Sequence, residues 1–477
     1  MLRSPRFRRY FAVAAVALLC RLGFILWHAT GVCFTAHGVF GSLYMSQGYA
    51  IAAGYGYIEA VDAQSPVAQH LRGLHDRVSQ EGLRLSPASA SPLPEGAIAP
   101  HTLHPPGIPL VVAGLHRLFG VPTDLPLQLI GTLLDVIAAV VVCWLAVRAV
   151  GERAGLFSGL LYATFPPLIY GAMSKDPDGW LGSFVVFATA CVWVAAHRSD
   201  WTAWIWSAAS GLLLGLGSYL RPDYLLMPVF LAPLLWLFTR NARRSLGGMA
   251  VAQCVALLVL FPWALRNHSQ CGRWMFTSSS VGPTLITGLG EFHNPWGFGY
   301  TDDDRAREAR AHGLSGPFTS EADLYFRNLF WASVKEHPWA YVKSVLRRTP
   351  LAVATPFEWG FVNPWKTSSF SADRSEGKDR FQVARSGPGR LVASYWDKLI
   401  MGVITLLGSV SAIWFLLKGT ASWRLSLLLL APHLYAIASH MLTHLEPRFL
   451  LPSVFCWLLA IGVLLARIGR RRSHLPQ

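Results

Sequence analysis

Charged residues are scarce in this 477-residue chain, where they make up 14% of the sequence. Soluble domains carry about 25% charged residues, so this chain has too few of them to cover several soluble cores. Its 53% of hydrophobic residues excludes an intrinsically disordered protein, and its 7 cysteines exclude a disulfide-dense scaffold. The composition therefore favours an integral membrane protein.

Acidic residues are fewer than basic ones: 26 Asp and Glu stand against 41 Lys and Arg, which gives a net charge of +15. In a soluble protein this excess would suggest a nucleic acid partner. In a membrane protein it is more typical of arginine-rich cytoplasmic loops and of contact with anionic lipid. We therefore expect membrane lipid, and no nucleic acid, as a partner.

Ten apolar runs are each long enough to cross a hydrocarbon core of ~30 Å as a helix. They lie near residues 11–27, 126–147, 154–173, 179–196, 203–220, 223–239, 246–265, 397–417, 423–442 and 448–467. The run Ile108–Phe119 is too short to span and is expected to lie at the membrane interface. The sequence thus predicts an all-α membrane protein with about ten transmembrane helices.

Basic residues in the connections orient these helices. With the N-terminus inside, the cytoplasmic connections are 148–153, 197–200, 240–244 and 418–424, followed by the tail 467–472. All of these except 197–200 are basic, as cytoplasmic segments tend to be. Both termini are therefore predicted to be cytoplasmic. Two large extracytoplasmic loops, residues 28–125 and 266–396, then carry interfacial helices, one of them over Trp339–Arg348.

This topology divides the chain into three parts. Residues 1–265 form an N-terminal transmembrane module that includes the first large loop. Residues 266–396 form the second loop, and residues 397–477 form the C-terminal transmembrane helices.

Ionisable residues gather at the extracytoplasmic ends of the predicted helices, whereas Asp135 is the clearest acid inside one. The residues at the helix ends are His101, His104, Lys175, Asp176, Asp178, Arg221, Asp223, Arg266, His268, His444, Glu446 and Arg448, with Asn267 beside them. A transporter tends to place such groups at mid-membrane. A shared cleft at the outer surface instead suits an enzyme with a lipid-linked substrate, although helix ends are often polar without any function.

Seven local patterns follow one another along the chain. They are Tyr44-x4-Tyr49-Ala50, His104-Pro105-Pro106-Gly107, Phe165-Pro166-Pro167-x-x-Tyr170 with Lys175-Asp176, Leu220-Arg221-Pro222, Phe261-Pro262-Trp263-x-x-Arg266-Asn267, Glu336-His337-Pro338-x-x-Tyr341 and His444-x-Glu446-Pro447-Arg448-Phe449. In this order the chain resembles the bacterial dolichyl-phosphate-mannose-protein mannosyltransferase-like glycosyltransferases of family 39, which have the GT-C fold.

The resemblance implies a hexosyltransferase or related glycosyltransferase of the bacterial inner membrane. Such an enzyme moves a monosaccharide from a polyprenyl-phosphate donor to a hydroxyl of a glycan, lipid or protein acceptor on the extracytoplasmic face, with inversion. Two alternatives stay open: a lipid or sugar-lipid transporter, and a catalytically silent relative. The second arises because Phe40 and Gly41 stand where the family usually has an aspartate, its presumed base.

Transfer from a sugar phosphate passes through an oxocarbenium-like state and needs a base for the acceptor and cations for the phosphate. For the catalytic base, Asp176 ranks first, Asp178 second and Glu59 third. The candidates for binding the donor phosphate or the substrates are Arg221, Arg266, Asn267, His104, Tyr44, Glu446 and Arg448.

Each of these residues also has a structural interpretation. The acids can cap helices, the arginines can extend to the interface, and Arg448 can pair with Glu446. The spacings His101-x-x-His104 and His440-x-x-x-His444 occur among metal ligands, but neither brings a cysteine or a close third ligand. The sequence therefore does not support a divalent metal, and it predicts no other cofactor.

Overall fold

The structure is a computed structural model. It describes residues 5–29, 39–62, 64–87, 92–120, 123–173, 177–354, 403–419 and 423–472. The elements up to residue 120 are α1 (Pro5–Ala29), α2 (Val39–Ala53), β1 (Ile58–Ala60), α3 (Pro66–Arg72), α4 (Leu74–Glu81), β2 (Ile98–Pro100) and α5 (Gly107–Phe119). The two short strands pair in antiparallel fashion, with Glu59 opposite Ala99.

The remaining described elements are all helices. They are α6 (Asp124–Ala149), α7 (Glu152–Thr164), α8 (Pro166–Met173), α9 (Pro177–His197), α10 (Thr202–Ser218), η2 (Pro222–Tyr224), α11 (Met227–Thr239), α12 (Ala242–Cys271), α13 (Val281–Gly290), α14 (Asp302–Ala311), α15 (Ser320–Glu336), α16 (Pro338–Ala354), η3 (Phe415–Gly419), α20 (Trp423–Leu442), η4 (Pro447–Ser453) and α21 (Phe455–Arg472). The predicted all-α class is confirmed.

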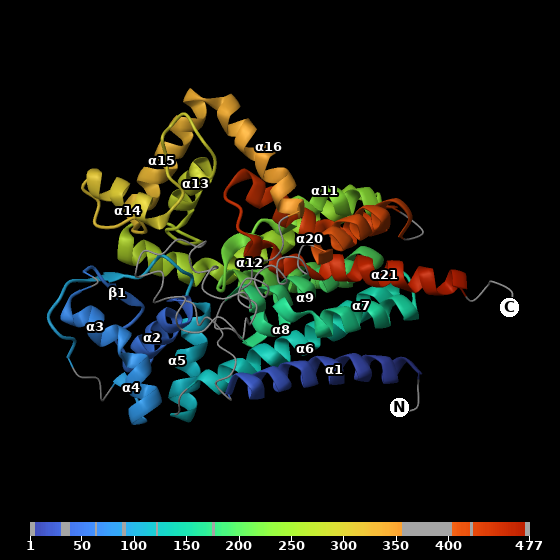
Figure 1. The fold of residues 1–477 in the computed structure, drawn as a ribbon, viewed down its shortest axis with the longest axis horizontal. Coiled ribbons are helices and arrows are strands. Elements are labelled where there is room, and N and C mark those ends of the chain that lie inside the picture. The colour runs from blue at the N-terminus through green and yellow to red at the C-terminus, as the bar shows by residue number, and fades with distance from the viewer. Residues whose placement is uncertain are drawn as a thin grey trace, which may run out of the picture.

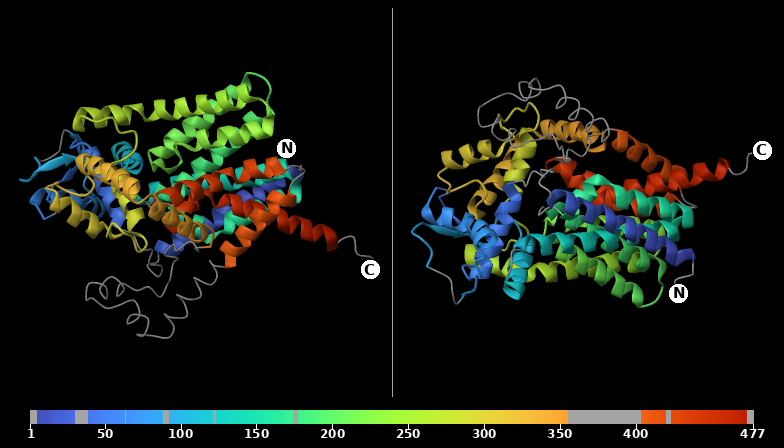
Figure 2. Two further views of the ribbon diagram at one scale, coloured as in Figure 1. Left: turned by 90° about the horizontal axis from the view of Figure 1, so that it is seen from above. Right: turned by 60° about the horizontal axis from the view of Figure 1, so that its bottom comes forward.

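The long helices form one bundle, and the shorter elements gather at one of its ends (Figure 1). The elements α2–α5 with β1, and α13–α15, occupy this end, while α16 leads back towards the bundle. The start of α1 and the end of α21 lie at the opposite end (Figure 2). The described parts of the two predicted loop regions therefore lie mainly at one end of the bundle.

Six helices are long and apolar enough to cross a membrane, and a seventh span arises if the bent pair α7–α8 counts as one. The predicted number of ten is not confirmed among the described residues. Two prolines explain part of the difference. Pro222 follows the end of α10, which has 17 residues, and Pro447 begins the 3-10 helix η4, which takes up the first part of the predicted run 448–467.

The predicted interfacial run is the 13-residue helix α5. At 1.5 Å per residue it is about 20 Å long, too short to cross a ~30 Å core. The second predicted interfacial segment lies within α16, where the Trp339 side chain is 81% exposed. The division of the chain at residues 265 and 396 stays a prediction; α12 runs on past the first boundary to Cys271, and the second lies outside the described residues.

A buried ion pair sits where α7 bends into α8 by 55°. Arg21 of α1 donates from Nε to Asp135 of α6 at 2.6 Å, and Tyr162 of α7 donates to the other carboxylate oxygen at 2.7 Å. Arg21 also donates to the carbonyl of Ala163 at 2.7 Å. This carbonyl has no helical partner four residues on, because Pro167 lacks an N–H. The intramembrane acid is thus part of a structural network that closes a helix break.

We expect Arg21→Leu to destabilise the protein strongly, because it leaves the Asp135 carboxylate buried without its cation. Breaking a buried ion pair from one side typically costs about 3–5 kcal/mol, whereas replacing both partners is far less costly. The double variant Arg21→Leu/Asp135→Leu should therefore recover much of the loss. Thermal unfolding of the purified protein in detergent measures both; equal stability of the single variant and the parent would contradict the expectation.

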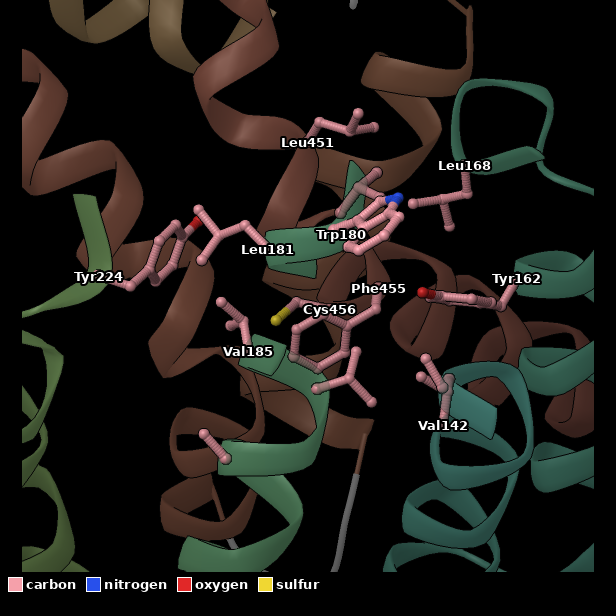
Figure 3. Close-up of a cluster of buried hydrophobic side chains, with 14 of the residues drawn as sticks. Val142, Tyr162, Leu168, Trp180, Leu181, Val185, Tyr224, Leu451, Phe455 and Cys456 are labelled. Atoms are coloured by element: carbon pink, nitrogen blue, oxygen red, sulfur yellow. The ribbon is translucent and has the colours of Figure 1, made fainter. Parts of the chain in front are cut away.

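A shared hydrophobic core ties the bundle to the turns that end it (Figure 3). The cluster includes Trp180 and Val185 of α9 together with Phe455 of α21, all at most 4% exposed. Tyr224 of η2 and Leu451 of η4 belong to the same cluster. The core therefore anchors both 3-10 turns, which also carry charged side chains. A second, smaller core lies within α13–α15 around Phe326.

Candidate functional site

Two proline turns of the same design carry charged residues at the end of the bundle. Arg221 precedes Pro222, and Glu446 precedes Pro447; both residues have extended backbones, as residues before proline prefer. Each proline starts a 3-10 turn, and a charged side chain of this turn pairs with the residue that precedes the proline. Arg221 pairs through Nε with Asp223 at 3.1 Å, and Glu446 pairs with Nε of Arg448 at 2.6 Å. The cation precedes the proline in the first turn, and the anion precedes it in the second.

Asp178 connects the first turn to α9. It lies in the first turn of that helix, where a carboxylate is favoured by the helix dipole, and its side chain is fully buried. Its Oδ1 accepts a hydrogen bond from Nη1 of Arg221 at 2.6 Å. Arg221 is therefore held between two carboxylates, Asp178 and Asp223, and keeps 20% of its side chain exposed.

The two arginines meet at one aromatic ring. Cζ of Arg221 lies 4.4 Å from the ring centre of Phe449, and Cζ of Arg448 lies 5.4 Å from it. Cations near the face of an aromatic ring are attracted by its quadrupole. Phe449 thus keeps two guanidinium groups, one from each proline turn, in one place. We call Arg221, Arg448 and Phe449 the arginine pair site.

A row of charges links the arginine pair site to the second loop region. His444 hydrogen-bonds to Glu446 at 3.2 Å and, through Nδ1, to Glu291 at the end of α13. Glu291 also pairs with the buried Arg348 of α16 at 2.5 Å. Burial disfavours the charged imidazole, but its contacts with Glu291 and Glu446 outweigh this and raise the pKa of His444 to about 9. Burial likewise opposes the Glu446 carboxylate, yet His444 and Arg448 lower its pKa to about 2.

The raised pKa of His444 predicts a pH-dependent contribution to stability. The folded protein holds the proton more tightly than the unfolded chain, whose histidine titrates near 6.5. The stabilisation is therefore complete below about pH 6.5, declines as the pH rises, and is absent above the folded pKa of about 9. Thermal unfolding should show the parent's advantage over His444→Gln shrinking from pH 6.5 to pH 9. A difference that stays constant over this range would contradict the assignment.

His104 and Tyr44 belong to the first loop region, and His104 lies within electrostatic range of Arg221 and Arg448. Their rings pack edge to face, with centres 5.4 Å apart. Burial and the positive charges of His101, Arg221 and Arg448 lower the pKa of His104 to about 3, so this imidazole is neutral at physiological pH. The start of α5 packs closely against the end of α10. The N–H of Gly107 donates to the backbone carbonyl oxygen of Tyr219 at 2.7 Å, and a Cβ atom at position 107 would lie only 2.4 Å from that oxygen.

Arg266, Asn267 and Glu59 form a second polar group that holds the first loop region in place. Arg266 donates to the carbonyls of His101 at 2.9 Å and Tyr57 at 2.6 Å. Asn267 is fully buried and donates to the carbonyl of Met275 at 2.9 Å. Glu59 hydrogen-bonds to His101 at 2.7 Å. These three candidates therefore contact protein groups in this structure, and the contacts of Arg266 and Glu59 surround His101, three residues before His104.

The structure thus brings together Asp178, Arg221, Glu446, Arg448, His104 and Tyr44 among the candidates from the sequence. Asp176, the first-ranked base, lies outside the described residues. Glu291, Arg348 and Phe449 join the site although they were not among the candidates. Glu291 and His444 are 153 residues apart, so no local pattern indicates their contact. Among the described residues, no group of three or more His, Cys, Asp or Glu could hold a metal ion.

Part of the chain matches a known protein family. Residues 103–265 match the model of the dolichyl-phosphate-mannose-protein mannosyltransferase family. This segment contains His104, Asp178 and Arg221 but ends before Arg448. The chain is also 32% identical, over 131 residues, to an undecaprenyl phosphate-alpha-4-amino-4-deoxy-L-arabinose arabinosyl transferase from Pseudomonas paraeruginosa; the match covers 26% of this chain and 23% of that protein.

The fold is similar to that of an oligosaccharyltransferase from Archaeoglobus fulgidus. The match to its crystal structure with Zn and sulfate has a TM-score of 0.50 at 15% identity and covers 97% of this chain and 49% of that one. Its apo form matches with the same TM-score and identity and is covered to 51%. The chain therefore spans about half the length of this structural relative and less of the curated one. The resemblance found in the sequence motifs is confirmed: the chain has the GT-C fold of membrane glycosyltransferases, and its segment 103–265 matches the dolichyl-phosphate-mannose-protein mannosyltransferase family.

Proposed function

We propose that this protein is a membrane glycosyltransferase that moves a monosaccharide from a polyprenyl-phosphate donor to an acceptor hydroxyl. The observation that carries the proposal is the arginine pair site, where two guanidinium groups meet at Phe449. The site contacts the start of α9 and the end of α20, two helices long and apolar enough to cross a membrane. Arginine binds phosphate oxygens through short, charge-assisted hydrogen bonds. An isoprenoid tail attached to that phosphate would suit the apolar surface of the bundle.

The charges around the two arginines set their orientation. Asp178 and Asp223 both pair with Arg221, and Glu446 pairs with Arg448. Each guanidinium presents N–H donors in a planar fork, whose geometry matches two oxygens of a phosphate. Holding the guanidinium groups before the donor binds reduces the reorganisation needed to stabilise the negative charge that develops on the departing phosphate.

The reaction needs few other groups. The acceptor hydroxyl oxygen forms a bond to the anomeric carbon while the bond from that carbon to the phosphate oxygen breaks. The polyprenyl phosphate leaves with the electron pair, and the hydroxyl proton passes to a carboxylate base. A single displacement of this kind inverts the anomeric configuration. The proposed base is Asp176, with Asp178 and Glu59 as the other candidates.

The relatives support the class of donor. The matched Pseudomonas protein is named for an undecaprenyl phosphate-linked aminoarabinose, and the matched family is named for dolichyl-phosphate-mannose. Both names describe a sugar on an isoprenoid phosphate. We propose the same donor class here, with a glycan, a lipid or a protein as acceptor.

Transfer of labelled sugar tests the proposal. The purified protein, in detergent or nanodiscs, is incubated with undecaprenyl-phosphate sugars labelled in the sugar and with a bacterial membrane extract as the source of acceptors. We expect the label to leave the carrier and appear in an acceptor fraction, and the Arg221→Gln/Arg448→Gln variant to serve as the inactive control. Donor binding with no transfer by the parent protein would overturn the enzymatic function and favour a transporter or a silent relative.

We also propose that the site faces away from the cytoplasm of the bacterial inner membrane. The start of α1 and the end of α21 lie together at the end of the bundle opposite the site (Figure 2). The connections assigned to that end are rich in basic residues, as cytoplasmic loops usually are. A reporter fused after Gln477 should therefore be cytoplasmic, and one inserted near residue 380 should be extracytoplasmic. A C-terminal reporter found outside would contradict this orientation.

A further inference from the structure

His440 lies beside the arginine pair site, in the last turn of α20. Its side chain is 7% exposed, and its ring centre is 4.8 Å from that of Phe449. The ring of Phe449 is the same one that Arg221 and Arg448 approach. One aromatic ring therefore has an imidazole and two guanidinium groups around it.

Charged residues of the two proline turns lie near the imidazole of His440. Arg221, Asp223 and His444 act on its imidazole electrostatically. One turn and a half earlier on the same helix, Tyr435 donates to the carbonyl of Asp223 at 2.8 Å. This contact fixes α20 against the proline turn that carries Arg221. The position of His440 relative to Arg221 thus follows from the packing of two rigid elements.

The Nε2 atom of His440 is buried and has no hydrogen-bond partner among the described residues. Leaving a buried polar atom unpaired costs free energy, so such atoms are rare and need an explanation. His433, on the same helix, carries the same unpaired nitrogen, so the feature that distinguishes His440 is its position beside the two arginines. An atom of a ligand that enters beside the two arginines would remove the cost.

We propose that His440 is a third ligand of the donor phosphate, which it binds through Nε2–H together with Arg221 and Arg448. This inference rests on the proposed function and adds to it a residue from a helix that the matched family segment does not include. The imidazole provides one directional N–H donor near the same ring as two forked cations. It would therefore fix the rotation of the phosphate, and with it the direction in which the sugar points.

The chain offers a matched control two turns away. His433 lies on the same helix, is 3% exposed and also has an Nε2 without a partner among the described residues. Its Nδ1, however, contacts Ser453 at 2.9 Å, and its ring packs against Trp457, with ring centres 4.6 Å apart. The variants His440→Phe and His433→Phe thus make the same change at two buried positions of one helix, but only one of them at the arginine pair site.

Binding of undecaprenyl phosphate to the full-length protein in nanodiscs tests the inference. We expect His440→Phe to weaken binding about ten- to a hundredfold, the range for a hydrogen bond to a charged group. His433→Phe should bind as the parent does, and His440→Gln, which keeps a donor, should lie between. Inorganic phosphate should compete only weakly, since the isoprenoid chain supplies much of the affinity.

Three outcomes distinguish a failure of this inference from a failure of the proposed glycosyltransferase function. If the parent binds undecaprenyl phosphate and folded His440→Phe binds it within twofold, the inference is wrong and the proposed function stands. If the parent itself does not bind undecaprenyl phosphate, both are wrong. If His440→Phe fails to fold, His440→Gln decides: affinity at or below a fifth of the parent's supports the inference, and anything closer to the parent's overturns it.

Discussion

Replacing Asp176 by asparagine should lower turnover by about 10²–10⁴-fold, the usual contribution of a general base. Asparagine keeps the size and hydrogen bonding of the side chain but cannot take the acceptor proton. Donor binding and protein yield should stay near those of the parent, because the substitution preserves the shape of the side chain. Steady-state transfer assays with the labelled donor would therefore show a fall in kcat at a nearly constant KM for the donor.

The matched variant is Asp178→Asn, two residues further along. Asp178 is fully buried and engaged with Arg221, so an acceptor hydroxyl has little access to it. We expect this variant to weaken donor binding more than it slows the bound complex, the opposite kinetic pattern from Asp176→Asn. If both variants retain nearly full turnover, Glu59 becomes the base to test. A parent-like rate in all three would reject general-base catalysis for this chain.

Replacing Arg221 by alanine should weaken donor binding about ten- to a hundredfold, because a charge-assisted hydrogen bond is typically worth ~1.5–3 kcal/mol. The same change leaves the buried Asp178 carboxylate without its cation, which by itself can destabilise the fold by about 3–5 kcal/mol. Donor affinity and thermal stability must therefore be measured on the same preparations.

The double variant Arg221→Gln/Asp178→Asn separates the two effects. It replaces the ion pair by two neutral amides that can still hydrogen-bond, so stability should return towards that of the parent while donor affinity stays low. Arg221→Lys keeps the charge but loses the planar fork, and we expect intermediate affinity. Parent-like donor affinity in the double variant would remove Arg221 from the donor site.

Arg266 provides a comparison for Arg221. The sequence predicts a donor-binding role for both, since both follow apolar helices at the same end of the bundle. In the structure the guanidinium of Arg266 donates to two backbone carbonyls of the first loop region, whereas Arg221 is held by carboxylates beside Arg448. An arginine at a helix end can hold a loop through its backbone carbonyls or can form part of a binding site, and its position at the helix end does not indicate which role it has.

The sequence by itself determined the class of protein and the local devices of the site. Long apolar runs indicate membrane helices because a helix must bury its backbone and expose apolar side chains in lipid. The prolines at positions 222 and 447 end helices and extend the residues before them, which is a local effect of the proline ring. The ordered motifs indicated the GT-C fold that the structure and the comparisons confirm.

Only the tertiary structure decided which charges meet. The contacts of Arg221 with Asp178, and of His444 with Glu291, join residues 43 and 153 positions apart. Such pairs depend on how the helices pack and on which end of each helix is nearby, and the residue types alone allow many other pairings. The same holds for the number of spans, because η4 and the bend between α7 and α8 arise where prolines interrupt runs that hydrophobicity alone would make continuous.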